Sequence, residues 1–196
     1  MIIVGYQGIG KSTLAYNRYR LGVDCIDLES SSFWVDGKRA DDWYKPYCQV
    51  AVHLSKQGYV VFTSSHEVVR NYLHEISDEP VVVIYPAIEL KDAWIKKLED
   101  RYNLTTLDKD YKALMNAKDR YVENISELMN SGLYTKPIDD IDYSLKDIIE
   151  SLLEEYLSAI MKYNFMKYNF DISDAVELEN FIPRLDLWEE KRKEYE

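Results

Sequence analysis

A short glycine-rich segment near the start of the sequence contains the residue types that bind phosphate. Residues 5–12 read Gly-Tyr-Gln-Gly-Ile-Gly-Lys-Ser, which fits the Walker A pattern of glycine, any four residues, and then Gly-Lys-Ser. Glycines let the backbone wrap closely around phosphate oxygens, with successive N–H groups pointing inward. Lys11 would bring positive charge to the β- and γ-phosphates, and the hydroxyl of Ser12 is a natural ligand for Mg²⁺. The residues that we expect to bind ATP are Gly8, Ile9, Gly10, Lys11, Ser12 and Thr13.

The residues on either side of this segment fit the structure that the motif requires. Residues 1–5 are a short apolar run that ends at a glycine, which is typical of a buried strand. Residues 11–20 are compatible with a helix, whose first N–H groups would point at the bound anion. A strand that enters the loop and a helix that leaves it favour a triphosphate site over a chance match.

Two carboxylates lie at the end of the second apolar run, residues 23–28, where the chain would leave the sheet. In an open α/β sheet, ligands bind at the carboxyl ends of the strands, so these acids should face the phosphate loop. Asp27 or Glu29 could accept a proton from a substrate or hold a metal-bound water. The alternative for each is an acid that caps a helix or lies in a loop. We expect Asp27 to be catalytic and Glu29 to bind the substrate.

Arginines and one tryptophan are further candidates for contacts with bound groups. The forked guanidinium groups of Arg39 and Arg70 suit bidentate recognition of phosphate. Trp34 could stack on a base, although a contact in the core or a lid is an equal alternative. Arg101 follows the fourth apolar run and shares a helix face with Lys97, so it could neutralise charge in a transition state. A solvated surface charge is the alternative for each arginine.

The third apolar run, residues 59–63, ends in Thr-Ser-Ser-His at residues 63–66. It lacks the aspartate that a Walker B strand carries, and the sequence has no guanine-reading Asn-Lys-x-Asp motif. These absences weigh against a motor-type ATPase or a GTPase. A serine before the acidic and apolar positions that follow predicts a helix cap, and His66 at that helix start is more often structural than catalytic.

Candidate strands and helices alternate along the chain, which predicts a parallel sheet with helices on both faces. The four clear strands fall at residues 1–5, 23–28, 59–63 and 80–86, with a weak fifth at 133–138. The expected helices fall at residues 11–20, 41–57, from about 67 to 76, 88–101, 108–130 and 144–163.

Length and composition restrict the class of protein. The chain has 196 residues, enough for one domain with a small appendage, and a formal net charge of −11 argues against a general nucleic-acid binder. Cys25 and Cys48 lack metal-ligand spacing and are expected to be buried. No signal peptide or membrane-spanning run is evident, so we expect a cytoplasmic protein. Residues 161–165 are repeated at once as residues 166–170, and an acidic tail follows.

With these motifs, the chain resembles the P-loop nucleoside and nucleotide kinases, especially the small phage-type kinases related to deoxynucleoside monophosphate kinases and adenylate kinase. The resemblance lies in residues 5–13, 26–30, 61–66 and 85–101. It implies a three-layer α/β/α fold of the P-loop NTPase type, with a five-stranded parallel sheet of order 2-3-1-4-5 and a helical lid at about residues 90–120. It also implies a kinase-like domain over residues 1–165. Residues 166–196 have no counterpart in this family; we expect them to form a helical extension, through which copies of the chain could associate.

The resemblance further implies transfer of the γ-phosphate of MgATP to a small acceptor. It places Lys11 on the phosphates, Ser12 on Mg²⁺, Arg101 in the lid and Asp27 near the acceptor. We therefore expect a kinase of nucleosides or nucleoside monophosphates that binds neither nucleic acid nor membranes. The alternative is a non-catalytic ATP-binding sensor or assembly module, which the missing Walker B aspartate and the unusual C-terminus favour. Kinase chemistry on a polynucleotide end is disfavoured by the net charge.

Overall fold

The structure is a computed structural model that describes residues 1–16, 24–33 and 38–169, with side chains as far as Ala159. The expected helix over residues 11–20 is therefore described only to Tyr16, and nearly all of the extension at residues 166–196 lies outside the described residues.

Five strands form a single parallel sheet in the order β2-β3-β1-β4-β5, as predicted. The strands are β1 (Ile2–Gly5), β2 (Cys25–Asp27), β3 (Val60–Thr63), β4 (Val81–Pro86) and β5 (Tyr134–Ile138). In the centre of the sheet, Ile3 lies opposite Phe62 on one side and Val82 on the other. The weak fifth strand is confirmed, and its Pro137 is tolerated because β5 lies at the sheet edge.

The three central strands are buried along their whole length, which explains why they read as continuous apolar runs. The edge strand β2 is less covered, and only its first residue, Cys25, is buried. Cys48 in α2 is buried as well, so both cysteines are buried, as expected. Burial raises the pKa of the Cys25 thiol to about 11 and that of Cys48 to about 12, so neither is a ready thiolate.

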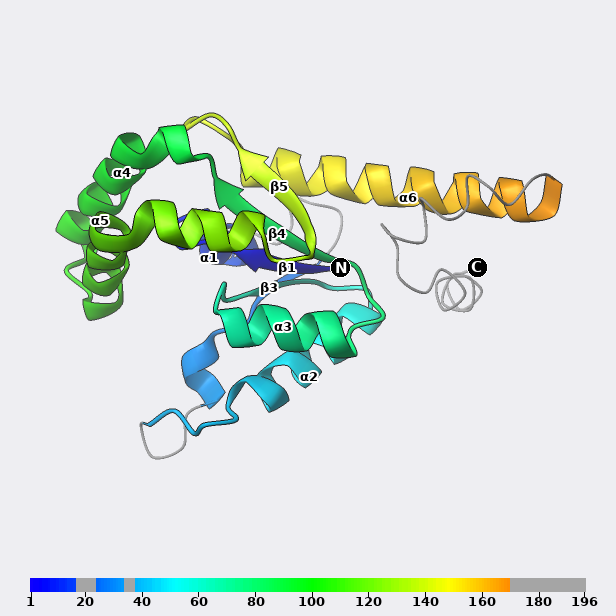
Figure 1. The fold of residues 1–196 in the computed structure, drawn as a ribbon, viewed down its shortest axis with the longest axis horizontal. Coiled ribbons are helices and arrows are strands. Elements are labelled where there is room, and N and C mark those ends of the chain that lie inside the picture. The colour runs from blue at the N-terminus through cyan, green and yellow to red at the C-terminus, as the bar shows by residue number, and fades with distance from the viewer. Residues whose placement is uncertain (17–23, 34–37, 170–196) are drawn as a thin grey trace.

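Helices cover both faces of the sheet (Figure 1). They are α1 (Lys11–Tyr16), α2 (Tyr44–Lys56), α3 (Glu67–Ile76), α4 (Lys91–Thr105), α5 (Asp108–Met129) and α6 (Leu145–Asn169). Right-handed crossovers between parallel strands put α1 on one face and α2, α3 and α5 on the other, and α6, which follows the last strand, packs beside α1. The contacts of α1 with α6 and of α2 with α3 agree with this arrangement. The result is the three-layer α/β/α architecture that the sequence predicted.

Helix α6 is longer than expected and runs past the end of the sheet in Figure 1. It continues as one helix to Asn169 and so crosses the expected domain boundary at residue 165. No helix in the described parts of the chain is both long and apolar enough to cross a membrane.

Helices α4 and α5 form a hairpin that includes residues 90–120, the segment expected to be a lid. A 3-10 turn (Ile88–Leu90) leads into α4, and Thr106 joins the two helices in a left-handed backbone conformation with φ of 54°. Within α5 the backbone departs from helical geometry at Arg120, where φ is −132°.

The start of α3 differs from the prediction. Its N-cap residue is His66 rather than a serine, and no side chain caps the helix. The hydroxyl of Ser64 instead lies 3.0 Å from Nδ1 of His66. The serine cap was therefore wrong, because Ser64 is used in a contact at the end of β3.

Candidate active site

The phosphate-binding loop has the backbone conformation that its glycines were expected to allow. Gly8 and Gly10 have φ of 85° and 97°, in the left-handed region that other residues avoid. At Gly5 the limit is space, since a Cβ there would lie 2.5 Å from Cδ1 of Ile9 and 2.8 Å from Cδ of Lys11. The loop needs glycine at all three positions, for two different reasons.

The loop is fastened to the sheet and to the α4–α5 hairpin. The Tyr6 amide donates to the carbonyl of Ile84 in β4 at 2.9 Å. The indole Nε1 of Trp94 in α4 donates to the Gln7 carbonyl at 3.1 Å, and Nε2 of Gln7 donates to the Ala113 carbonyl in α5 at 2.8 Å. A movement of the hairpin would therefore be transmitted to the loop.

Lys11 is folded back against the loop. Its ammonium donates to the carbonyls of Gly5 at 2.7 Å and Tyr6 at 3.2 Å. Burial lowers the pKa of this ammonium to about 8, an effect that the carboxylates of Asp27 and Glu29 oppose and the charge of Arg101 assists. A bound phosphate would supply the negative charge that this buried cation lacks.

Ser12 and Asp27 meet at the carboxyl edge of the sheet. The Ser12 hydroxyl, at the start of α1, donates to Oδ2 of Asp27, at the end of β2, over 2.5 Å. Hydroxyl and carboxylate oxygens are the ligands that Mg²⁺ prefers. No cluster of three or more His, Cys, Asp or Glu side chains capable of holding a metal occurs in the described parts of the chain. These two residues therefore fit a Mg²⁺ ion that takes its other ligands from phosphate and water.

A cleft of about 920 Å³ opens in front of the loop and extends to the α4–α5 hairpin. The loop residues expected to bind ATP line it, together with four of the other candidates from the sequence: Asp27, Glu29, Arg39 and Arg101. Trp34 lies outside the described residues. On the hairpin side the lining includes Thr105, Leu107, Lys109, Asp110, Lys112 and Asn116.

Arg39 is held in one wall of the cleft by an aromatic ring and a histidine. Its guanidinium carbon lies 4.3 Å from the centre of the Trp43 ring, and Nη1 lies 3.2 Å from Nε2 of His66. Because arginine can only donate, Nε2 of His66 accepts this bond, which assigns the proton to Nδ1 facing Ser64. The His66 side chain is exposed at the surface but partly desolvated by its neighbours; this desolvation and then the charges of Arg39, Arg70 and Lys11 lower the pKa of His66 to about 4, so the ring is neutral at pH 7.

Arg70 lies beneath this wall instead of on it. It is only 5% exposed, its Nη1 donates to the Ser65 carbonyl, and it is not among the residues that line the cleft. The sequence placed Arg70 after β3 but could not show that the side chain turns inward. In this conformation Arg70 supports the turn that carries Ser64 and His66.

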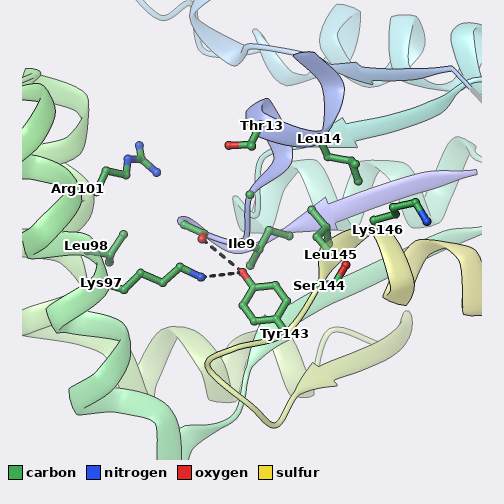
Figure 2. A pocket seen from close by; sticks show the side chains of 12 residues that line it. Ile9, Thr13, Leu14, Lys97, Leu98, Arg101, Tyr143, Ser144, Leu145 and Lys146 are labelled. Carbon is green, nitrogen blue, oxygen red and sulfur yellow. Dashed lines mark hydrogen bonds between the residues drawn. The ribbon is translucent and has the colours of Figure 1, made fainter. Parts of the chain in front are cut away.

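A second hollow, of about 440 Å³, also borders the loop and shares Gly8, Ile9, Gly10 and Thr13 with the cleft (Figure 2). Lys97, Leu98 and Arg101 enter it from α4, opposite Ile9 and Thr13. The remaining side comes from Tyr143 and Ser144, which precede α6, and from Leu145 and Lys146 in its first turn. Arg101 lines both hollows and so lies at their junction.

Tyr143 is a site residue that the sequence gave no means of finding, since it lies in a loop without a motif. Its ring stacks on Trp94, with centroids 5.8 Å apart and planes inclined by 15°. Its hydroxyl accepts from Lys97 at 3.2 Å and lies 3.5 Å from the carbonyl of Gly8 (Figure 2). Burial raises the pKa of Tyr143, which keeps its hydroxyl protonated as the donor to Gly8.

Two further basic residues, Lys118 and Arg120 of α5, do not reach the cleft. Lys118 binds Glu99 of α4 at 2.9 Å, and Arg120 binds Glu123 of its own helix at 2.7 Å. Neither lines either of the two hollows described above. Arg101 is thus the lid arginine that faces the site.

The sheet order and the glycine loop define a protein of the P-loop α/β class. No protein-family model and no curated protein matches the chain. Among solved structures, it is similar to the shikimate kinase of Bacteroides thetaiotaomicron, with 17% sequence identity and a TM-score of 0.49 over 80% of this chain and 97% of that one. A likeness of this degree does not indicate a substrate.

Proposed function

We propose that the protein is an ATP-dependent phosphotransferase that moves the γ-phosphate of MgATP to a small acceptor, a nucleoside or a nucleoside monophosphate. The observation that carries this proposal is a Walker A loop that borders two hollows, both of which are also lined by Arg101. Two hollows that meet at one phosphate loop suit two substrates, one that gives a phosphoryl group and one that receives it.

The hollow of about 440 Å³ suits the nucleoside part of ATP. Ile9, Leu98 and Leu145 give it apolar sides, and the aromatic ring of Tyr143 lies at its edge. From there the phosphates would run along the loop to Lys11, where the N–H groups at the start of α1 point. Mg²⁺, held by Ser12 with Asp27 beside it, would neutralise charge on the phosphate oxygens.

The cleft of about 920 Å³ suits the acceptor. Its oxygen would attack the γ-phosphorus in line with the bond to the β-phosphate, which breaks as ADP leaves. Where the attacking group is a hydroxyl, its proton would pass to the carboxylate of Asp27; a phosphate acceptor has no proton to lose. Arg39 and Glu29 line the same cleft and would position the acceptor, while Lys11 and Arg101 stabilise the charge on the transferred group.

The test is phosphate transfer from γ-labelled ATP to a panel of nucleosides, nucleoside monophosphates and other small hydroxyl compounds. We expect a labelled product with at least one of them. Lys11→Met should abolish the product, and Asp27→Asn should reduce it strongly while ATP is still bound. Absence of an acceptor-dependent product across the panel would defeat the enzyme proposal.

A second function is favoured by the end of β3. The chain has Thr63, Ser64, Ser65 and His66 where a Walker B strand would carry an aspartate. A non-catalytic ATP sensor or assembly module needs no such residue. It would show nucleotide-dependent self-association without turnover, which light scattering with ATP, ADP and no nucleotide can detect.

A further inference from the structure

The guanidinium of Arg101 is held by a buried carboxylate. Its Nη2 donates to Oδ1 of Asp110, in the first turn of α5. The side chain of Asp110 is only 2% exposed, whereas that of Arg101 is 42% exposed and lines both hollows. Asp110 is therefore buried in the α4–α5 hairpin, whereas the Arg101 guanidinium reaches the site.

The second oxygen of Asp110 is also bound. The Thr105 hydroxyl, at the end of α4, donates to Oδ2 over 2.5 Å. Burial alone would raise the pKa of Asp110, but the hydrogen bonds from Arg101 and Thr105 and the charges of Arg101 and Lys109 bring it below its usual value. Asp110 is thus ionised at neutral pH, with each oxygen engaged.

This arrangement does more than join two helices. Glu99 and Lys118 already link α4 to α5 at the surface, and they lie away from the hollows. The charge of Arg101, in contrast, reaches Lys11, whose pKa it helps to lower. Two cations that repel each other across a phosphate site need an anion to hold one of them there before the nucleotide arrives.

We propose that Asp110 is a positioning residue, which fixes the Arg101 guanidinium toward the γ-phosphate of a bound triphosphate. The inference rests on the proposed binding of ATP at the loop but not on the identity of the acceptor. An arginine fixed in advance loses less side-chain freedom when it binds the phosphate. Its contribution should therefore appear as a preference for ATP over ADP.

The experiment measures dissociation constants for MgATP and MgADP without acceptor, by calorimetry, in the wild-type protein, Asp110→Asn, Arg101→Ala and the double variant. Asparagine keeps the size of Asp110 but removes its charge. We expect the ratio of the ADP constant to the ATP constant to fall about tenfold in Arg101→Ala and by a similar factor in Asp110→Asn. The double variant should be no worse than Arg101→Ala, because Asp110 acts through Arg101.

Glu99→Gln is the matched control, since it breaks the other ion pair between the same helices. It should leave the ratio unchanged. If Asp110→Asn does not fold, judged by its thermal transition, Thr105→Val replaces it; this variant removes one hydrogen bond to the carboxylate and should lower the ratio by a smaller factor.

The inference is overturned if the Asp110 variant, or Thr105→Val in its place, keeps the wild-type ratio. It is also overturned if the losses in the double variant multiply, or if Glu99→Gln gives the same loss. These results are distinct from failure of the kinase proposal, which appears only in the acceptor panel.

Discussion

The protonation of Lys11 should control nucleotide affinity in mildly alkaline solution. In the nucleotide-free protein, burial lowers the pKa of this ammonium from 10.5 to about 8. A triphosphate brings negative charge next to the ammonium and should return its pKa to 10 or above. Binding should therefore be accompanied by uptake of a proton whenever the pH is near 8.

The magnitude follows from the two pKa values. At pH 7 nearly all molecules carry the proton, whereas at pH 9 about one in eleven does, so affinity for ATP should be about tenfold lower at pH 9 than at pH 7. At pH 8 binding should take up about half a proton per ATP.

The same shift affects stability, with a definite sign. The unfolded chain keeps Lys11 protonated up to about 10.5 and the folded chain only up to about 8. Between these values the unfolded state binds more protons, so the unfolding free energy of the nucleotide-free protein should rise with pH. The full shift corresponds to about 3 kcal/mol, an upper figure because solvent reaches part of the side chain.

Calorimetric titration of ATP at pH 8 in two buffers with different ionisation enthalpies measures the proton uptake directly. Lys11→Met is the matched variant, since it keeps an unbranched side chain only one atom shorter and removes the charge. It should bind ATP more weakly, with no proton uptake and no loss of affinity between pH 7 and 9. The reasoning is refuted if the wild-type protein takes up no proton at pH 8, or if Lys11→Met takes up as much.

Two further predictions concern the loop and the wall of the cleft. Gly10→Ala should destabilise the nucleotide-free protein by about 1–2 kcal/mol in urea unfolding, because φ is 97° but the nearest side-chain atom is 3.9 Å from the new Cβ. Gly8→Ala should cost more, since its Cβ would also lie 2.9 Å from Leu98; equal losses would contradict this. For His66, the folded pKa of about 4 lies below the usual 6.5, so protons bind the unfolded chain first and stability should fall as the pH drops from 6.5 toward 4. His66→Gln should reduce the difference between urea midpoints at pH 7 and pH 5, and an unchanged difference would count against the neutral ring.

Much of the fold could be predicted because local patterns and topology agree. Apolar runs indicated the strands, of which the first ends at glycine and the fourth at proline, and the five-stranded order came from the family resemblance. The weak strand at residues 133–138 was predicted despite Pro137, since a proline at a sheet edge breaks no ladder. The start of α3 was predicted wrongly, because a serine near a helix start can bond either to the helix or to a neighbouring side chain. Here the contact with His66 takes Ser64.

The direction in which a side chain points could not be predicted from the sequence. By residue type and position, Arg39 and Arg70 were equal candidates to bind an anion. In the structure, Arg39 lies in the cleft wall and Arg70 is buried beneath it. Arg101 in α4 and Arg120 in α5 both lie in the region expected to form the lid. Their ion-pair partners determine where each guanidinium lies: Asp110 holds Arg101 at the site, and Glu123 holds Arg120 on the surface of α5.

The sequence by itself determined the phosphate loop, because glycines at fixed spacing, a lysine and a serine act through backbone geometry that is local to eight residues. It also placed Asp27 at the edge where that loop ends. Only the tertiary structure decided what surrounds the loop: the Tyr143 ring against Trp94, the hollow beside it, and the buried Asp110 that holds Arg101. Those contacts join residues far apart in the chain, and their geometry depends on how the helices pack against the sheet.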